Sequence, residues 1–128
     1  MHLHTLTPNL AVDDVQATID WYEKLGFNLE MTVPDKGPFD WAMVKMGEIE
    51  LMFQRTGSLQ DEIPGLGQPG GGFTLFIRMT GVQEMRDKAD ALDAIVVDLH
   101  KTFYQATEVA IKDPSGYHLV FAEFDDAE

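Results

Sequence analysis

The hydrophobic positions of the chain switch between helical and strand spacing, and the first helical segment covers residues 14–25. Its apolar residues follow an i, i+4, i+7 spacing and share one helix face: Val15, Ile19 and Tyr22. Asp13 or Asp14 can accept hydrogen bonds from the free amides of the first turn, and Gly26 can end the helix in a left-handed conformation. The pattern predicts a capped amphipathic helix over about 14–25.

Alternating apolar and polar residues predict strands on both sides of this helix and again in the second half of the chain. The expected strands are 1–12, 27–33, 39–46, 49–54, 73–79, 95–99, 107–112 and 117–124, with a second helix over about 81–93. In the first strand, alternation places Leu6, Leu10 and Val12 toward the helix and leaves Thr7 and Asn9 on the opposite face. The glycine- and proline-rich stretch 55–72 reads as a long connecting loop.

The two halves repeat each other. A shift of 67 positions places Val15 on Val82 and Leu25 on Leu92, which indicates a degenerate internal duplication. The expected fold is α+β, with two βαβββ modules that form a curled mixed sheet around a cleft and carry their helices on the outer face. We expect one domain over 1–128, with modules at about 4–56 and 73–124 joined by a loop at 57–72.

Composition narrows the classes of function. The chain of 128 residues has no cysteine, which excludes disulfides, thiolate metal sites and cysteine nucleophiles. It has neither a long apolar run nor a secretory leader, so we expect a soluble cytoplasmic protein without a membrane partner. The formal net charge of −13 argues against nucleic-acid binding and, if it influences ligand choice at all, favours neutral or cationic ligands.

Three motifs together resemble one known group of proteins. They are Leu10-x-Val12-x-Asp14-Val15, Trp21-Tyr22-x-x-Leu25-Gly26-Phe27, and Asp113-Pro-Ser-Gly116-Tyr117 followed by Leu119 and Phe121-x-Glu123. The chain resembles the vicinal oxygen chelate superfamily, which includes glyoxalase I, fosfomycin resistance proteins, extradiol dioxygenases and bleomycin resistance proteins. The resemblance implies the paired βαβββ fold and a small-molecule ligand, but it does not specify a reaction.

The resemblance also assigns four metal-ligand positions. Three of them correspond here to Thr7, Thr74 and Val120. The fourth corresponds to Glu50 if Ile49-Glu-Leu51 matches the carboxylate motif of glyoxalase I, or to Met52 if the internal repeat sets the match. Because such residues do not supply the three or four nitrogen and oxygen ligands of a catalytic metal centre, we expect no metal cofactor. A divalent metal at a different set of residues is the alternative.

The four histidines differ in what their positions predict. His2 and His4 lie an even number of residues from Leu6 and so share its strand face, or parity. Both are expected to be solvated, and His100 is expected at the surface. His118 shares the parity of Val120, so it is the histidine to test as a ligand or general base. If the protein is an enzyme, the catalytic candidates are Glu50, His118 and Glu108.

Parity also predicts which side chains line the cleft. Trp41, Met43, Met52 and Phe76 would give it an apolar floor, and Arg78 would add a cation. Tyr104 and Glu108 belong to a stretch that looks like the family's Tyr-Gly-x-Arg-Glu, with Gln105 and Thr107 in place of its glycine and arginine. The full predicted ligand-binding set is Thr7, Asn9, Trp41, Met43, Glu50, Met52, Thr74, Phe76, Arg78, Tyr104, Glu108 and Val120. A direct ion pair between Arg78 and Glu108 is an alternative to ligand binding.

Two functions from different classes remain open. The first is a metal-free binding protein of the bleomycin-resistance type that holds an apolar or aromatic ligand. The second is a metal-dependent lyase, isomerase or dioxygenase. In either case we expect a homodimer, because open sheets leave unpaired edge strands. The family resemblance adds to this expectation, since relatives with a single pair of modules usually dimerise.

Overall fold

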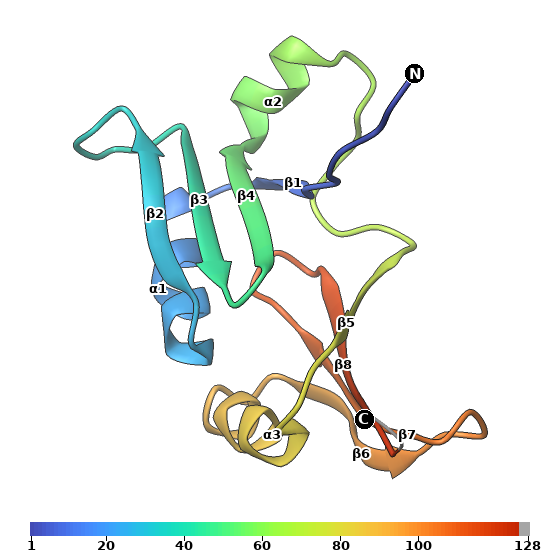
Figure 1. Cartoon of the computed structure of the whole chain (residues 1–128). Helices are drawn as coiled ribbons and strands as arrows, with labels where there is room; N and C mark the ends of the chain where they lie inside the picture. Colours follow the sequence, from blue (N-terminus) through green and yellow to red (C-terminus); the bar gives the residue numbers. More distant parts are fainter. Residues whose placement is uncertain (126–128) are drawn as a thin grey trace. The chain divides into compact units, whose positions relative to one another are not determined.

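The computed structural model describes residues 1–125, which divide into two compact units, Met1–Pro69 and the part of the chain from Gly70 onward. Each unit contains a four-stranded mixed sheet (Figure 1). No helix within the described residues is both long enough and apolar enough to cross a membrane. The predicted α+β class and the two βαβββ modules are confirmed.

The first unit is built in the order β1 (Asn9–Val12), α1 (Val15–Leu25), β2 (Asn28–Val33), β3 (Trp41–Met46), β4 (Ile49–Arg55) and α2 (Thr56–Glu62). Its sheet has the strand order β1-β4-β3-β2, in which β1 runs parallel to β4 and the other neighbours are antiparallel. Helix α1 lies along one face of this sheet (Figure 1). Of the helices in this unit, only α2 contacts the opposite face, at β1 and the end of β4 near Gln54, and we call this face the open face of the first unit.

Local sequence explains where α1 begins and ends. The Asp14 carboxylate accepts a hydrogen bond from the Ala17 amide at 2.9 Å, which confirms Asp14 as the N-cap. Gly26 follows the helix at a φ of 120°, which side chains rarely tolerate. The helix buries its apolar stripe against the alternate positions of the sheet: Leu10, Val12, Ala42, Val44, Leu51 and Phe53. Each large side chain buried there contributes about 1.5–3 kcal/mol relative to exposure.

The second unit repeats the order with β5 (Thr74–Arg78), α3 (Val82–Ala91), β6 (Ile95–Lys101), β7 (Ala106–Lys112) and β8 (His118–Phe124). Its strand order β5-β8-β7-β6 is the same, with β5 parallel to β8 and α3 packed on one face. Phe76 lies opposite Val120 in this sheet as Asn9 lies opposite Met52 in the first. The internal duplication predicted from the sequence is therefore present in the strand pairing.

Helix α3 takes its cap from a distant strand. Gly81 stands at its N-cap with a φ of 93° and has no side chain to accept the free amides. The Glu123 carboxylate from β8 accepts the Gly81 and Val82 amides at 2.9 and 3.0 Å instead. On the other side of the helix, Arg86 forms a two-pronged ion pair with Asp98 of β6, which lowers the pKa of Asp98 to about 2.

The predicted strand 1–12 is wrong over its first eight residues. Regular pairing starts only at Asn9, and Leu6 is 87% exposed instead of facing the helix. Pro8 explains the boundary, because it has no amide hydrogen to donate to a neighbouring strand. Its carbonyl still accepts the Met52 amide at 2.9 Å, and that bond is where the contact with β4 begins.

The predicted loop 55–72 is also partly wrong, because its first half forms helix α2. Within this helix Thr56 and Leu59 are buried. Leu59 is therefore the one large apolar side chain that packs a segment of otherwise mostly polar residues. The Gln60 side chain donates to the Gly67 carbonyl at 2.8 Å and ties the remaining turns to the helix. One leucine in seven residues is too weak a pattern to predict a helix among so many glycines and prolines.

We expect Glu123→Ala to lower the free energy of unfolding by about 1–2 kcal/mol, because two amides at the start of α3 lose their acceptor. Glu123→Gln keeps an acceptor oxygen but loses the charge at the helix N-terminus, so its loss should be smaller. Urea unfolding measures both. Glu84→Ala, on the same helix and 3.9 Å from Lys88, is the matched control and should cost less than about 0.5 kcal/mol. Equal losses for Glu84→Ala and Glu123→Ala would contradict the cap.

Candidate ligand-binding site

The open face of the first unit is apolar at its centre. Met43 and Met52 lie opposite each other on β3 and β4, and Met31 of β2 extends the row. Trp41 is half-buried on the same face, opposite Gln54 and beside Val33. The predicted facing of Trp41, Met43 and Met52, away from the helix, is what the register gives.

Polar groups border this apolar row at two places. Asn9 donates to the Gln54 side chain at 2.9 Å, and Gln54 in turn donates to Ser58 and Glu62 of α2. Gln54 is buried, so this network fixes its amide and joins α2 to the sheet. At the other end of β4, Glu50 lies opposite Lys45. Thr7 lies before the first strand and is half-buried.

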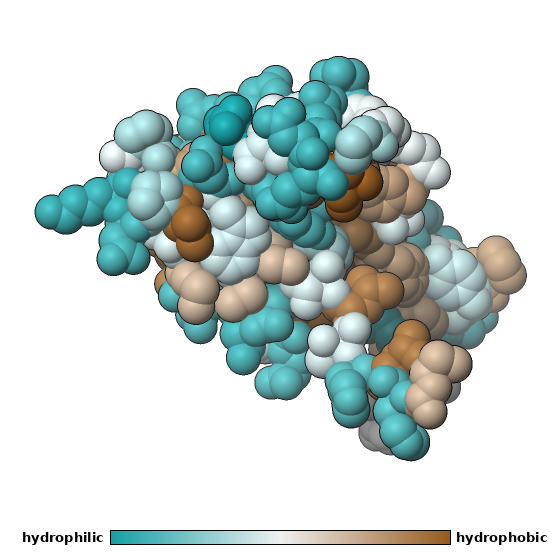
Figure 2. All heavy atoms as spheres, turned by 90° about the horizontal axis from the view of Figure 1, so that it is seen from above, coloured by the Kyte–Doolittle hydropathy of each residue, from teal (hydrophilic) through white to brown (hydrophobic). Residues whose placement is uncertain are grey.

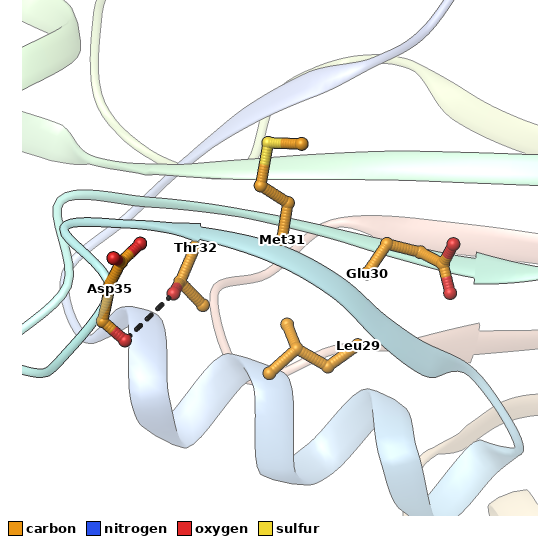
Figure 3. Close-up of a pocket in the computed structure, with 5 residues that line it drawn as sticks. All are labelled: Leu29, Glu30, Met31, Thr32 and Asp35. Atoms are coloured by element: carbon orange, nitrogen blue, oxygen red, sulfur yellow. Dashed lines mark hydrogen bonds between the residues drawn. The ribbon is translucent and has the colours of Figure 1, made fainter.

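A shallow pocket of about 360 Å³ lies along the edge strand β2, lined by Leu29, Glu30, Met31, Thr32 and Asp35. The register of β2 shifts between Leu29 and Met31, so these two residues do not share one face as strict alternation would require. Figure 3 shows Leu29 on the side of α1 and Met31 on the opposite side. One short stretch of chain forms all of its walls, whereas ligand pockets enclose most of a ligand's surface. We therefore do not assign the ligand site to this pocket.

The face of the second sheet that lies away from α3, which we call the open face of the second unit, carries most of the predicted site residues of that half. On β5, Thr74 lies opposite His118, Phe76 opposite Val120 and Arg78 opposite Ala122. Glu108 of β7 lies on the other side of Ala122, so Ala122 separates Arg78 from Glu108 across the sheet. Phe76 is 48% exposed, and Val120 and His118 are half-buried.

Four of these side chains form a continuous group, which we call the Phe124 cluster: Arg78, Phe124, Tyr104 and Glu108. The Arg78 guanidinium lies over the Phe124 ring, 4.0 Å from its centre. The Tyr104 ring is 5.8 Å from the same ring, and its hydroxyl donates to the Glu108 carboxylate. Arg78 and Glu108 therefore have different partners, and the alternative of an ion pair between them is not what the structure shows.

The Tyr104–Glu108 hydrogen bond has an electrostatic consequence. Glu108 is 7% exposed, and its carboxylate raises the pKa of the Tyr104 hydroxyl above its usual value, with desolvation adding to the effect. The phenol thus stays protonated and continues to donate to Glu108. The bond also gives one oxygen of the Glu108 carboxylate a hydrogen-bond donor on a largely apolar face.

The positions that the family resemblance assigns to metal ligands do not fit a metal ion. Thr74 and Val120 lie on the open face of the second unit, Thr7 belongs to the first unit, and none of the three carries a side chain that ordinarily binds a divalent cation. Strand pairing makes Met52 the counterpart of Val120, and Glu50 the counterpart of His118. Within residues 1–125 no group of three or more His, Asp or Glu side chains lies close enough together to hold a metal ion.

Several residues that form the open faces were not identified from the sequence. Phe124 shares the parity of Val120, and Gln54 shares the parity of Met52, so alternation alone could have placed both on the open faces. Met31 could not have been placed in this way, because the bulge at Glu30 reverses the alternation of β2. His2 and His4 are exposed and His100 is exposed, as predicted.

We expect the pKa of Tyr104 to fall toward its usual value of about 10 in Glu108→Gln, because the neutral amide no longer penalises the phenolate. The raised pKa means that this contact stabilises the fold fully below pH 10 and loses its contribution as the pH rises through the folded-state pKa. Carbon-13 NMR of labelled tyrosine follows the titration, with Tyr104→Phe used to assign the resonance. Identical midpoints in the wild type and Glu108→Gln would contradict the contact.

Comparison with known proteins agrees with this architecture. A model of the Glyoxalase/Bleomycin resistance protein/Dioxygenase superfamily matches residues 2–121. No curated protein sequence matches the chain. Among solved structures, TioX from Micromonospora sp. ML1 is 23% identical, with a TM-score of 0.77 over 94% of this chain and 98% of its own.

Two further structures share the fold. The bleomycin resistance determinant encoded on transposon Tn5 is 22% identical, with a TM-score of 0.65 over 96% of this chain and 99% of its own. A superfamily member from Sphaerobacter thermophilus DSM 20745 is 12% identical, with a TM-score of 0.76 over 95% and 98%. At these identities the structures show the fold alone. Since the superfamily model covers nearly the whole chain, the protein belongs to the Glyoxalase/Bleomycin resistance protein/Dioxygenase superfamily.

Proposed function

We propose that the protein is a metal-free small-molecule-binding protein that holds an apolar or aromatic ligand on its open sheet faces. The observation that supports this proposal best is the contrast between the two faces of each sheet. One face is buried under a helix, whereas the other keeps aromatic and methionine side chains partly exposed: Trp41, Met43, Met52 and Phe76. Aromatic walls with a few polar groups are typical of small-molecule sites.

The polar groups at the border of each open face support selective binding of a ligand rather than non-specific binding of any apolar compound. In the first unit the fixed Gln54 amide lies opposite Trp41, and in the second unit Arg78 and Tyr104 flank Phe124. Figure 2 shows that hydrophilic side chains cover much of one side of the molecule, with apolar ones between them. One structural relative is itself named a bleomycin resistance determinant, which agrees with ligand sequestration in this fold.

We also propose that both units act as one domain and that the chain forms a homodimer in the cytoplasm. The strands β1, β2, β5 and β6 end their sheets, and such edges tend to pair or to be covered. Exposed apolar residues on two of these strands, Met31, Val33, Val96 and Val97, add surface that association would bury.

The binding proposal predicts an effect of Trp41. In a Trp21→Phe background the emission of Trp41 should change when flat, apolar aromatic compounds bind. Trp41→Ala should then weaken binding by about 2- to 12-fold, which corresponds to the loss of one aromatic stacking contact. Because Trp41→Ala lacks the fluorescent side chain, isothermal titration calorimetry measures the affinity of this variant.

Leu10→Ala serves as the comparison for stability, because Leu10 is buried beneath α1. It should cost about 2–5 kcal/mol in urea unfolding, and Trp41→Ala should cost less. If Trp41→Ala unfolds the protein as severely as Leu10→Ala, and no compound in the panel changes the emission, Trp41 is a core residue and the proposal loses its support.

Metal content separates this function from the metal-dependent lyase, isomerase or dioxygenase that is its alternative. Protein purified without chelator from metal-replete medium should contain far less than one Zn, Ni, Mn or Fe per chain, because Thr7, Thr74 and Val120 replace the family's ligands. Plasma mass spectrometry measures this. A content near one metal per chain that is lost in Glu50→Gln or His118→Ala would favour the enzyme instead.

A further inference from the structure

The Arg78 guanidinium differs from the paired cations of the described chain. Arg55, Arg86 and Lys101 each form an ion pair with an aspartate at 2.9 Å or less. Arg78 has no carboxylate within salt-bridge distance among residues 1–125 and lies over the Phe124 ring instead. The chain has 22 acidic residues, yet none of those that the structure describes pairs with this cation.

The contact with Phe124 leaves the guanidinium able to bind an anion. A guanidinium has five N–H groups, and an aromatic ring has no lone pair to accept them, so the contact with Phe124 leaves these groups able to donate to an oxygen acceptor. Arg78 is exposed at the edge strand β5, and the ring holds it in place. A planar carboxylate is the group that such a fork binds best.

The nearby carboxylates that the structure describes do not compete for this position. Glu108 lies two strands away, about 10 Å at the usual strand spacing, and its carboxylate accepts the Tyr104 hydroxyl. Glu123 has the opposite parity on β8 and caps α3, and Asp125 pairs with Lys101. The net charge of −13 acts weakly here, because charges further than about 8 Å away are largely screened at physiological salt.

An apolar surface for a ring lies next to this cation. Phe76 is on the same strand and face as Arg78, about 7 Å along the strand, and Val120 lies opposite Phe76. Both side chains are at least partly exposed. A fused aromatic ring against Phe76 and Val120 therefore places a ring-attached carboxylate near the Arg78 N–H groups.

We propose that the open face of the second unit binds aromatic carboxylates, with Arg78 pairing with the carboxylate and Phe76 and Val120 contacting the ring. This inference rests on the proposed binding function and specifies the class of its ligand. It departs from the preference for neutral or cationic ligands that net charge alone suggests, because a local, ring-supported arginine outweighs screened distant charges.

The test compares 2-naphthoate with 2-naphthamide, which has nearly the same shape and no charge. Calorimetry on the wild-type protein should give at least tenfold tighter binding of the carboxylate, and added salt should reduce only that binding. Arg78→Gln should remove the preference by weakening 2-naphthoate alone, and Arg78→Lys should keep part of it. Phe76→Ala should weaken both compounds. Arg55→Gln, which removes the same charge in the first unit, should change neither.

The outcomes separate the two proposals. Equal binding of both compounds to the wild type, or a preference that persists in Arg78→Gln, overturns the carboxylate inference and leaves the binding function standing. Binding of neither compound overturns the inference, and the Trp41 experiment then decides on the binding function separately. Circular dichroism and urea unfolding of each variant establish that it is folded, and since 2-naphthamide binding should be unchanged in Arg78→Gln, it serves as an internal control on the site.

Discussion

The parallel pairing of the first strand of each unit with its last strand decides how the rest of the unit is arranged. A parallel neighbour requires a crossover connection, which begins with α1 in the first unit and with α3 in the second. The helix that follows the first strand then covers one face of the sheet, and alternation commits the other set of side chains to the open face. Trp41 is only half-buried and Phe76 is exposed for this reason, and not because their own sequence surroundings are polar.

This constraint explains how the site combines stability with binding. Residues such as Val44 and Phe121 fill the core under the helices. The residues next to them in the chain point to the opposite face and do not have to pack against a helix. The buried Glu108 is an exception, as Gln54 is in the first unit, because it lies on the open face and yet is almost inaccessible. Its hydrogen bond to Tyr104 offsets part of the cost of burying a carboxylate and, by holding the phenol ring near Phe124, helps to support the aromatic platform under Arg78.

The sequence predicted most elements to within one or two residues, because strong alternation and clear end signals such as Asp14 and Gly26 mark them. It failed where one residue acts against the local pattern. Pro8 shortens the first strand, Leu59 alone supports α2, and the bulge at Glu30 reverses β2. The facing of the site residues followed from parity, whereas their partners did not. That Arg78 would lie on Phe124 and not on Glu108 depends on side-chain reach across three strands, which no local pattern encodes.

The different caps of the two helices bear on how the chain folds while it is being synthesised. Helix α1 is capped by Asp14, which precedes the donating Ala17 amide by three positions, so its first turn can form as soon as it emerges from the ribosome. Helix α3 depends on Glu123, which follows Val82 by 41 residues. At about 5–20 residues per second, that separation delays the cap by about 2–8 seconds. The first unit can thus reach its native helix contacts while the second still has an uncapped helix and an unpaired β5, so order of synthesis becomes order of folding.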